Sequence, residues 1–360
     1  MYVKVDDLNY NDKYVVDTQN KVAEHSTVKR VTKGSVVFPK RGAAIMTNKV
    51  RIMGIDSYMD TNMMALTSEK LDSEFLYNII SKEGLYKIAD TSTIPQINNK
   101  HVEPYEVTIP SLDEQRKIGA YFKQLDHLIT LHQHKCDETK KLKKFMLQKM
   151  FPQNEQNVPG IRFEGFTDAW EQRKLDDVAE FSKGSGYSKG DLIESGTPII
   201  LYGRLYTKYE TSISDVDTFV EAKDGSVYSK GGEVIVPASG ETAEDIARAA
   251  SVDKSGILLG GDLNVVMPNE DINSTFLAIS ISNGSSQREL ARKAQGKSVV
   301  HIHNEEIRNL VVPFPTKTEQ NKIENYFADL DHLITLHQHK CDELQKIKKF
   351  MLQKMFVQEK

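Results

Sequence analysis

Residues 126–151 read DHLITLHQHKCDETKKLKKFMLQKMF, and residues 331–356 repeat this stretch as DHLITLHQHKCDELQKIKKFMLQKMF. The two copies are identical at 23 of 26 positions and lie 205 residues apart (331 minus 126). Such a repeat is sought first, because missing it leads to the wrong fold. Apolar residues recur at intervals of three and four in both copies, which predicts a long helix with one apolar stripe.

Both helices are expected to begin at the same signal. Pro110-Ser111-x-x-Glu114 and Pro315-Thr316-x-x-Glu319 are each a proline followed by a capping box, whose side chains bond the first free backbone N–H groups. From cap to final phenylalanine each helix is about 60 Å long, at roughly 1.5 Å per residue. Two such stripes in one chain most simply bury each other, so we expect an antiparallel coiled coil with the domains at its opposite ends. The residues expected at the helix-pair interface are Leu125, Leu128, His132, Cys136, Leu142 and Met146, then Leu330, Leu333, His337, Cys341, Ile347 and Met351.

Composition indicates an ordinary globular protein of two or three domains. The chain has 360 residues, of which 27% are charged and 39% hydrophobic. No apolar run reaches membrane-spanning length, and the first residues do not form a signal peptide. The two cysteines lie at equivalent points of the repeat, so no disulfide framework is implied and a reducing cytoplasm fits. A net charge of −4 argues mildly against nucleic acid, although a local basic patch would suffice for binding.

The helices divide the chain into two divergent mixed α/β domains, an α+β organisation overall. Val234-Ile235-Val236-Pro237 after Lys230-Gly231 corresponds to Val36-Val37-Phe38-Pro39 after Lys33-Gly34. The expected order is a first domain at 1–110, a central helix at 111–151, a linker at 152–170 that leads into a second domain at 171–315, and a distal helix at 316–356.

The two domains are expected to differ at their starts. Val3–Leu8 matches Ile200–Leu205 best, at a shift of 197 residues (200 minus 3). Residues 158–198 therefore have no counterpart in the first half. The sequence predicts a first domain that is short at its start by roughly 40 residues, which is small beside a typical domain.

Motifs for catalysis are missing from the sequence. Gly296-Lys297-Ser298 resembles the end of a phosphate-binding loop, but the earlier glycine falls at Ala291 and no strand is expected before it. We find no nucleophile elbow, zincin pattern or methyltransferase tetrad. The prediction is a chain without catalytic residues or cofactors of its own.

The repeated His132-x-His134-x-Cys136 and His337-x-His339-x-Cys341 allow two interpretations. His132 and Cys136 share a helix face, so with His337 and Cys341 they would form a Cys₂His₂ zinc set. Alternatively, they are a polar residue and a small hydrophobe at the helix interface. We favour the second interpretation and predict no metal, because a helical HxH lacks the turn geometry of zinc fingers.

Polar residues of the two domains are the candidates for binding DNA. Arg and Lys suit guanine, Asn and Gln suit adenine, and cations suit phosphate, whereas simple solvation is the alternative for each residue. The candidates in the first domain are Arg30, Lys40, Arg41, Asn48, Lys49, Arg51, Thr91, Ser92, Thr93, Gln96 and Asn98. Those in the second domain are Tyr202, Arg204, Tyr206, Lys208, Ser239, Arg288, Arg292, Lys293, Lys297, Ser298 and His301.

The whole pattern resembles the specificity (S) subunit of type I restriction–modification systems. The resemblance depends on the two tails that run from Pro110 and Pro315, through Glu-Gln-x-x-Ile, to Lys-Lys-x-x-Leu-Gln-Lys-Met-Phe. It implies two target-recognition domains, each of which binds one half of a split, asymmetric DNA sequence. It also implies that the helices fix the unread spacer and dock two methyltransferase (M) subunits, with restriction (R) subunits as further partners and no membrane. The alternatives are an interaction scaffold that no longer recognises a full bipartite site, or a stand-alone DNA enzyme.

Overall fold

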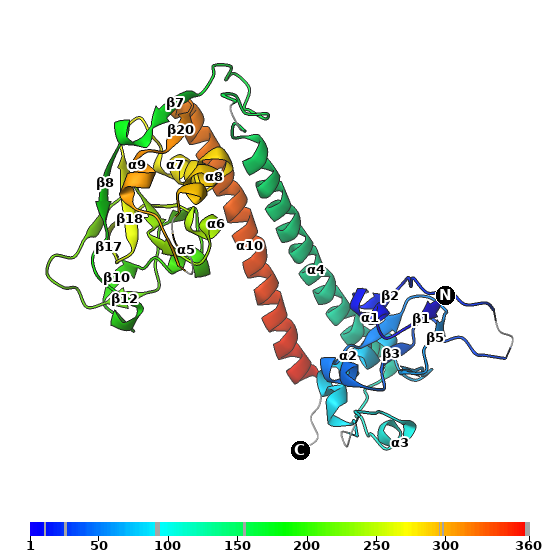
Figure 1. The fold of residues 1–360 in the computed structure, drawn as a ribbon. Helices are drawn as coiled ribbons and strands as arrows, with labels where there is room; N and C mark the ends of the chain where they lie inside the picture. The colour runs from blue at the N-terminus through cyan, green and yellow to red at the C-terminus, as the bar shows by residue number, and fades with distance from the viewer. Residues whose placement is uncertain are drawn as a thin grey trace. The chain divides into compact units, whose positions relative to one another are not determined.

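The computed structural model describes residues 1–10, 12–24, 27–90, 94–153, 156–294, 296 and 299–356, apart from the side chain of Glu244. The chain forms two compact units. Unit 1 comprises Met1–Cys136 and Leu336–Lys360, and unit 2 comprises Asp137–Thr335. Two long helices, α4 (Leu112–Lys149) and α10 (Lys317–Met355), each contribute residues to both units (Figure 1).

The two long helices are antiparallel. In unit 1 the Sγ of Cys341 donates to Gln133 Oε1, and further along α4 the Sγ of Cys136 donates to Gln338 Oε1, both at 3.7 Å. Residue numbers in these contacts therefore increase along α4 while they decrease along α10. These two contacts are equivalent under the 205-residue offset, with the roles of the helices exchanged. The prediction of an antiparallel helix pair is confirmed.

One regular series of less exposed positions, which we call the seam, runs along both helices. Its intervals alternate between four and three residues, the 3.5-residue period of a left-handed coiled coil. In α4 the seam comprises Ile118, Phe122, Leu125, Ile129, His132, Cys136, Thr139, Lys143, Met146 and Met150. In α10 it comprises the equivalents at offset 205, namely Ile323, Phe327, Leu330, Ile334, His337, Cys341, Leu344, Lys348, Met351 and Met355.

Four of the residues expected at the interface lie outside the seam, and three of these four are exposed. Leu142, Leu333 and Ile347 are 45%, 41% and 37% exposed. Each lies one residue before a seam position, because strict 3.5-residue spacing selects the following residue even where that residue is a lysine. Leu128 is also off the seam, but it packs against the cluster that joins the first domain to the helices. The other expected interface residues are buried or partly buried.

Each lysine of the seam forms an ion pair with an aspartate of the other long helix. Lys348 Nζ lies 2.5 Å from Asp126 Oδ1 in unit 1, and Lys143 Nζ lies 2.5 Å from Asp331 Oδ1 in unit 2. The two pairs are equivalent under the same offset. A lysine on a coiled-coil seam costs stability unless its charge is paired, so the aspartates explain why these positions tolerate it.

The seam also contains a contact between two counterparts, because His132 and His337 are themselves related by the 205-residue offset. Their Nδ1 atoms are 3.1 Å apart and share a hydrogen bond, which requires at least one neutral ring. Burial, the neighbouring His337 and then Lys135 and Lys340 lower the pKa of His132.

This lowered pKa predicts a loss of stability in acid. His132 is protonated more easily in the unfolded chain than in the folded one. The stability that its neutral form contributes is therefore complete above the unfolded pKa of about 6.5, and it is lost as pH falls through the lower folded pKa. Thermal unfolding between about pH 7.5 and about pH 5.5 measures the loss. We expect His132→Asn with His337→Asn to reduce the pH dependence, whereas the exposed His127→Asn leaves it unchanged. Equal pH dependence in all three proteins would contradict this assignment.

The first domain, in unit 1, is built on a four-stranded sheet of order β2-β4-β3-β6. The central strand β3 is buried on both faces, since Val36 and Phe38 enter one hydrophobic cluster and Val37 enters another. The strands are β1 (Tyr2–Val3), β2 (Tyr14–Val15), β3 (Val36–Pro39), β4 (Arg51–Met53), β5 (Tyr58–Met59) and β6 (Met63–Leu66). The short helices are α1 (Asp7–Tyr10), α2 (Ser73–Glu83) and α3 (Asn99–Val102).

The domain of unit 2 is larger and contains two five-stranded sheets, of order β11-β16-β14-β18-β8 and β13-β17-β10-β12-β9, and the pairs β15-β19 and β20-β7. Its strands are β7 (Glu171–Lys174), β8 (Ala179–Lys183), β9 (Leu192–Ile193), β10 (Thr197–Ile200), β11 (Ser212–Ile213), β12 (Phe219–Val220), β13 (Tyr228–Lys230), β14 (Glu233–Pro237), β15 (Ser239–Gly240), β16 (Ala250–Val252), β17 (Ser255–Leu259), β18 (Leu263–Pro268), β19 (Val300–His301) and β20 (Val311–Phe314). Its helices are α5 (Arg204–Thr207), α6 (Ala243–Ile246), α7 (Ser274–Ile281), α8 (Gly284–Lys293) and α9 (Asn304–Arg308).

One sheet has the same order in both units. The series β2-β4-β3-β6 corresponds to β11-β16-β14-β18, with the first pair parallel and the others antiparallel in both. Unit 2 adds β8 beside β18. Among the described residues, no strand lies beside β6 at the corresponding edge.

A glutamine at the start of each long helix fixes the adjacent domain to that helix. In unit 1 the backbone N–H of Asp72, the N-cap residue of α2, donates to Gln115 Oε1 (3.0 Å), and Gln115 Nε2 donates to the Pro110 carbonyl (3.0 Å). Gln320 makes the same two contacts in unit 2, with Asn273 at the start of α7 (2.8 Å) and with Pro315 (3.0 Å). Both domains therefore attach to their helices through one shared arrangement.

Candidate functional site

In unit 2 the strand pair β15–β19 gathers four of the candidate residues for DNA binding. Ser239 Oγ and His301 Nδ1 are 3.1 Å apart, and the two residues also face each other in the strand pairing. The hydroxyl of Tyr206 donates to the Ser239 carbonyl (2.8 Å), and the Tyr202 ring lies edge-on to Tyr206 with centroids 6.3 Å apart. These contacts make a surface that is both polar and aromatic.

Two cavities lie beside this surface. One of about 590 Å³ is lined by Tyr202, Tyr206, Ser239 and Arg248, and another of about 950 Å³ shares Tyr202 and adds Lys208. Burial raises the pKa of Tyr206, so its hydroxyl stays protonated and acts as a donor. Phenols and hydroxyls in a hollow of this size, with the His301 imidazole bonded to Ser239, offer the donors and acceptors that hydrogen-bond to base edges.

Arg248 was missed by the sequence analysis. Its guanidinium lies over the rings of Tyr206 and Tyr209, at 6.0 and 5.2 Å, and lines the smaller cavity. In the sequence it stands among alanines before a buried strand, and its two tyrosine partners come from an earlier part of the chain, so no local pattern marks it.

The other candidates of unit 2 that the structure describes are exposed or have charged partners of their own. Arg204 is buried and bonds Glu210 and Asp217, which is a structural role. Lys208 and then Arg204 hold the pKa of Asp217 at about 2, so this carboxylate stays charged. Arg288 and Arg292 are exposed on α8, and Lys293 on the same helix pairs with Glu289 (2.8 Å).

Unit 1 brings two candidates together at the equivalent place. Arg41 and Gln96 form an isolated antiparallel bridge, and the N–H of Ile97 donates to the carbonyl of Lys40 (2.8 Å). Arg41 follows β3 at the same distance as Ser239 follows β14, and Gln96 corresponds to His301 at the offset of 205. The Arg41–Gln96 and Ser239–His301 pairs are therefore counterparts, which we call the loop pairs. Candidates Thr91, Ser92, Thr93, Lys297 and Ser298 lie outside the described residues.

Lys40 adjoins the loop pair of unit 1, and several other described candidates of this unit support the fold. Asn48, at a positive φ of 48°, donates to the Ser81 carbonyl (2.9 Å). Arg51 donates to the carbonyls of Leu8 and Val50, both at 2.8 Å. Lys49 bonds Asn9, Arg30 pairs with Glu24 over the Tyr58 ring, and Asn98 caps α3.

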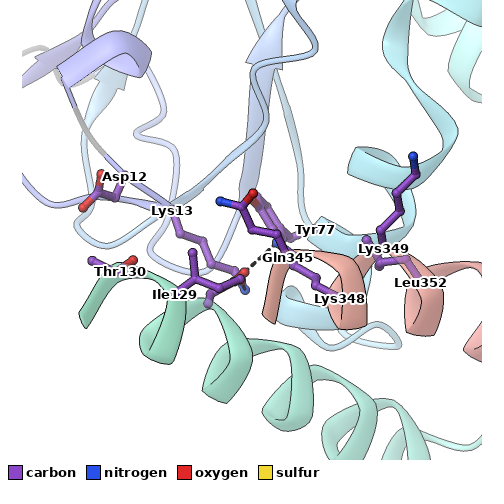
Figure 2. A pocket seen from close by; sticks show the side chains of 10 residues that line it. Asp12, Lys13, Tyr77, Ile129, Thr130, Gln345, Lys348, Lys349 and Leu352 are labelled. Carbon is purple, nitrogen blue, oxygen red and sulfur yellow. Dashed lines mark hydrogen bonds and ion pairs between the residues drawn. The ribbon is translucent and has the colours of Figure 1, made fainter. Parts of the chain in front are cut away.

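A charged cavity of about 400 Å³ in unit 1 joins the domain to the helix pair (Figure 2). Lys13 Nζ lies 2.6 Å from Glu74 Oε2 and 2.7 Å from Asp126 Oδ2, and Lys348 completes the pairing of Asp126. Burial opposes the charge of Lys13, but Asp126 and Glu74 outweigh it and raise the pKa of this lysine. Because its charges already neutralise one another, this cluster anchors the domain to the helices.

Unit 2 has a counterpart of this anchor. Thr211 Oγ1 lies 3.5 Å from Lys143 Nζ and 3.3 Å from Asp331 Oδ2, so a residue of the second domain contacts the equivalent ion pair. Over the part of the chain that the structure describes, no three His, Cys, Asp or Glu side chains are arranged to hold a metal ion. Among the same residues, no helix has the length and apolarity needed to cross a membrane.

Comparisons with known proteins agree with this architecture. A family model described as "Type I restriction modification DNA specificity domain" matches residues 2–141 and 167–346. The specificity subunit of the type I restriction enzyme MjaVIII from Methanocaldococcus jannaschii is 22% identical over 313 residues, which are 82% of this chain and 73% of that protein.

Two solved structures share the fold. The S subunit of a type I restriction–modification system from M. genitalium has a TM-score of 0.62 at 14% identity, over 100% of this chain and 89% of that one. A chain from a study of complex assembly and conformational transition of the type I R-M system has a TM-score of 0.53 at 15% identity, over 98% of this chain and 90% of that one.

Proposed function

The chain belongs to the family of type I restriction–modification DNA specificity domains, and we propose that it is the non-catalytic subunit that directs such a complex to its DNA sequence. Each domain recognises one half of a bipartite, asymmetric sequence. The paired helices set the unread spacer and dock two methyltransferase subunits. The partners are double-stranded DNA, the methyltransferase subunits and restriction subunits.

The observation that carries this proposal is that the two loop pairs occupy equivalent positions in the two domains but have different side chains. An arginine donates two hydrogen bonds to guanine and a glutamine pairs with adenine, whereas serine and histidine offer a different set of donors and acceptors. Equivalent positions with unlike side chains select unlike bases. Two such positions in one chain therefore support an asymmetric target.

Exposed cations elsewhere on the domains supply the contacts to phosphate. Arg288 and Arg292 on α8 are suited to this role. Because the chain carries a net charge of −4, we propose that the methyltransferase subunits supply most of the positive charge around the duplex.

Substitutions in the loop pairs test the proposal. We expect Ser239→Ala with His301→Ala to relax the second half-site, and Arg41→Ala with Gln96→Ala to relax the first. Each lost base contact is worth about 1–3 kcal/mol, or roughly 5- to 150-fold in discrimination. Methylome sequencing of cells that express the variants with the methyltransferase measures both half-sites. The exposed Lys21→Ala and Glu270→Ala are controls. A change of both half-sites by either double variant would contradict separate recognition.

The second candidate function is an interaction subunit that binds its partners without recognising a full bipartite site. The part of the chain that the structure describes places no strand beside β6, which favours this candidate because the first domain then has a smaller sheet than the second. Co-purification of a methyltransferase subunit without sequence-specific methylation would support this second candidate. Methylation of a bipartite sequence would exclude it.

A further inference from the structure

Lys13 connects the sheet of the first domain to both α2 and α4 in unit 1. It directly precedes β2, and its carbonyl accepts a hydrogen bond from the Ile52 N–H of β4 (2.9 Å). Its side chain is only 9% exposed, with Nζ 2.6 Å from Glu74 Oε2 on α2 and 2.7 Å from Asp126 Oδ2 on α4. Lys348 of α10, drawn with Lys13 in Figure 2, pairs with the other oxygen of Asp126 at 2.5 Å. One side chain therefore joins the domain to the ion pair of the long helices.

The same position in unit 2 carries a hydroxyl instead of a charge. Thr211 directly precedes β11, the counterpart of β2, and its carbonyl accepts from the Ser251 N–H of β16 (3.0 Å). It therefore occupies the place of Lys13 in the sheet. Its Oγ1 contacts Asp331 Oδ2 (3.3 Å) and Lys143 Nζ (3.5 Å), which form the equivalent ion pair.

The second charged group of the domain is exchanged in the same way. Glu74 and Thr275 each lie two residues after the N-cap residue of their helix, α2 and α7. Thr275 bonds the hydroxyl of Ser251 (2.9 Å), whereas Glu74 pairs with Lys13. The long helices thus present the same ion pair to both domains, and each domain contacts it with its own set of side chains.

The contacts of Lys13 are a second attachment point of the first domain. Gln115 holds the start of α2 at one point, and a body held at one point is free to turn about it. The apolar cluster around Phe75 and Phe122 adds attraction, but burial of apolar surface is non-directional. Hydrogen-bonded charges act only over a narrow range of distances and angles. Lys13 therefore selects one orientation of the domain on the helices.

The tilt of the domain determines where its loop pair lies along the duplex. β2 pairs with β4 and β4 pairs with β3, and Arg41 of the loop pair lies two residues after β3. A turn of this sheet therefore moves the loop pair with it. One base pair rises about 3.4 Å, so a displacement of about that size brings the loop pair to a target whose spacer differs by one base pair.

We propose that Lys13 is a positioning residue, which fixes the tilt of the first domain on the long helices and so restricts the target to one spacer length. It acts through Glu74 and Asp126, because its own side chain is buried. Buried charges suit this role, since a buried ion pair often adds little net stability and instead selects one register. This inference rests on the proposed function, because it assigns a residue to the spacing of the two half-sites.

The test variant is Lys13→Met with Glu74→Gln. It removes one positive and one negative charge, Lys348 still pairs with Asp126, and the glutamine keeps an acceptor for the Tyr14 hydroxyl. Methylome sequencing of cells that express it with the methyltransferase compares targets of normal spacer with targets one base pair shorter or longer. We expect the relative methylation of the off-length targets to rise on the order of 10-fold, which corresponds to about 1.4 kcal/mol. Both half-sites should remain unchanged.

Lys117→Met with Asp113→Asn is the matched control. It removes the same two charges from an ion pair of α4 in which both side chains are 79% exposed. Lys13→Arg is the conservative variant, and we expect it to keep one spacer, because a guanidinium has donors for two carboxylates. Reduced methylation at an unchanged spacer, or loss of all methylation, would overturn the proposal, because the cluster would then serve folding alone. So would the same spacer change in the control.

Hydrogen exchange of the chain without DNA separates this inference from the proposed function. In the test variant the domain turns more freely, so the Asp72 N–H bonded to Gln115 should exchange on the order of 10-fold faster. The Asn273 N–H bonded to Gln320 in unit 2 should be unchanged. Unchanged exchange at Asp72 would contradict the inference. If the unaltered chain directs no methylation of a bipartite target, the proposed function fails, and the exchange result still decides whether Lys13 fixes the domain.

Discussion

A four-residue insertion after Cys136, matched by one after Cys341, is expected to lengthen the unread spacer of the DNA target by one or two base pairs. Four residues add about 6 Å to a helix and turn it by about 40° beyond one full turn. One base pair of DNA rises about 3.4 Å and turns about 34°, so a small increase in spacer matches both the translation and the rotation. Methylome sequencing of cells that express the variant with the methyltransferase reports the spacer.

A seven-residue insertion at the same two points is the control. It preserves the seam, because seven residues are one full repeat of the 3.5-residue period. It lengthens each helix by about 10 Å, which is the rise of about three base pairs of DNA. The helix turns by only about 20° from a whole number of turns, whereas three base pairs turn the duplex by about 100°. We therefore expect it to abolish methylation while the protein stays folded. An unchanged spacer after the four-residue insertion would show that the helices do not set it.

Replacing residues 171–314 with the corresponding domain of another family member is expected to change the second half-site completely. The first half-site and the spacer should remain. The reason is that Gln320 attaches the domain through backbone groups, the N–H at the start of α7 and the carbonyl of Pro315, which do not depend on the residues that contact DNA. A new domain with the same cap would dock in the same way.

The control for this replacement is the reverse exchange, in which the first domain is replaced and the second is kept. Methylome sequencing of both chimaeras should show two changes in separate halves of the target. If one exchange alters both halves, the domains do not recognise DNA independently. A chimaera with Gln320→Ala should lose stability, because it leaves the partly buried N–H at the start of α7 without its acceptor.

Much of the architecture could be predicted from the repeat alone, because a near-identical apolar stripe in two copies requires a partner surface. The seam residues were less predictable. Counting apolar residues selects Leu142 and Ile347, but the coiled coil follows a strict period and places Lys143 and Lys348 at those turns instead. That choice is stabilised by aspartates far along the chain, which local pattern does not reveal.

The candidate site was predictable only in part, for a similar reason. Arg41, Gln96, Ser239 and His301 were named as separate polar residues, and the structure brings them into two equivalent pairs. Other basic and amide residues, such as Arg51 and Arg204, bond carbonyls or carboxylates within the fold. A sequence does not distinguish a cation that faces solvent from one whose partner is supplied by a distant loop. Which side chains contact bases remains a prediction.

The self-equivalent contact between His132 and His337 has a consequence for how the target acquires its asymmetry. Apart from Thr139 and its counterpart Leu344, the seam carries the same residues in both helices, so each helix presents nearly the same surface as its partner. A fragment with one domain and one helix would accordingly associate with its twin. Its target would be a palindrome. The helices by themselves favour inverted-repeat DNA, and only the covalent joining of two unlike domains makes the target directional.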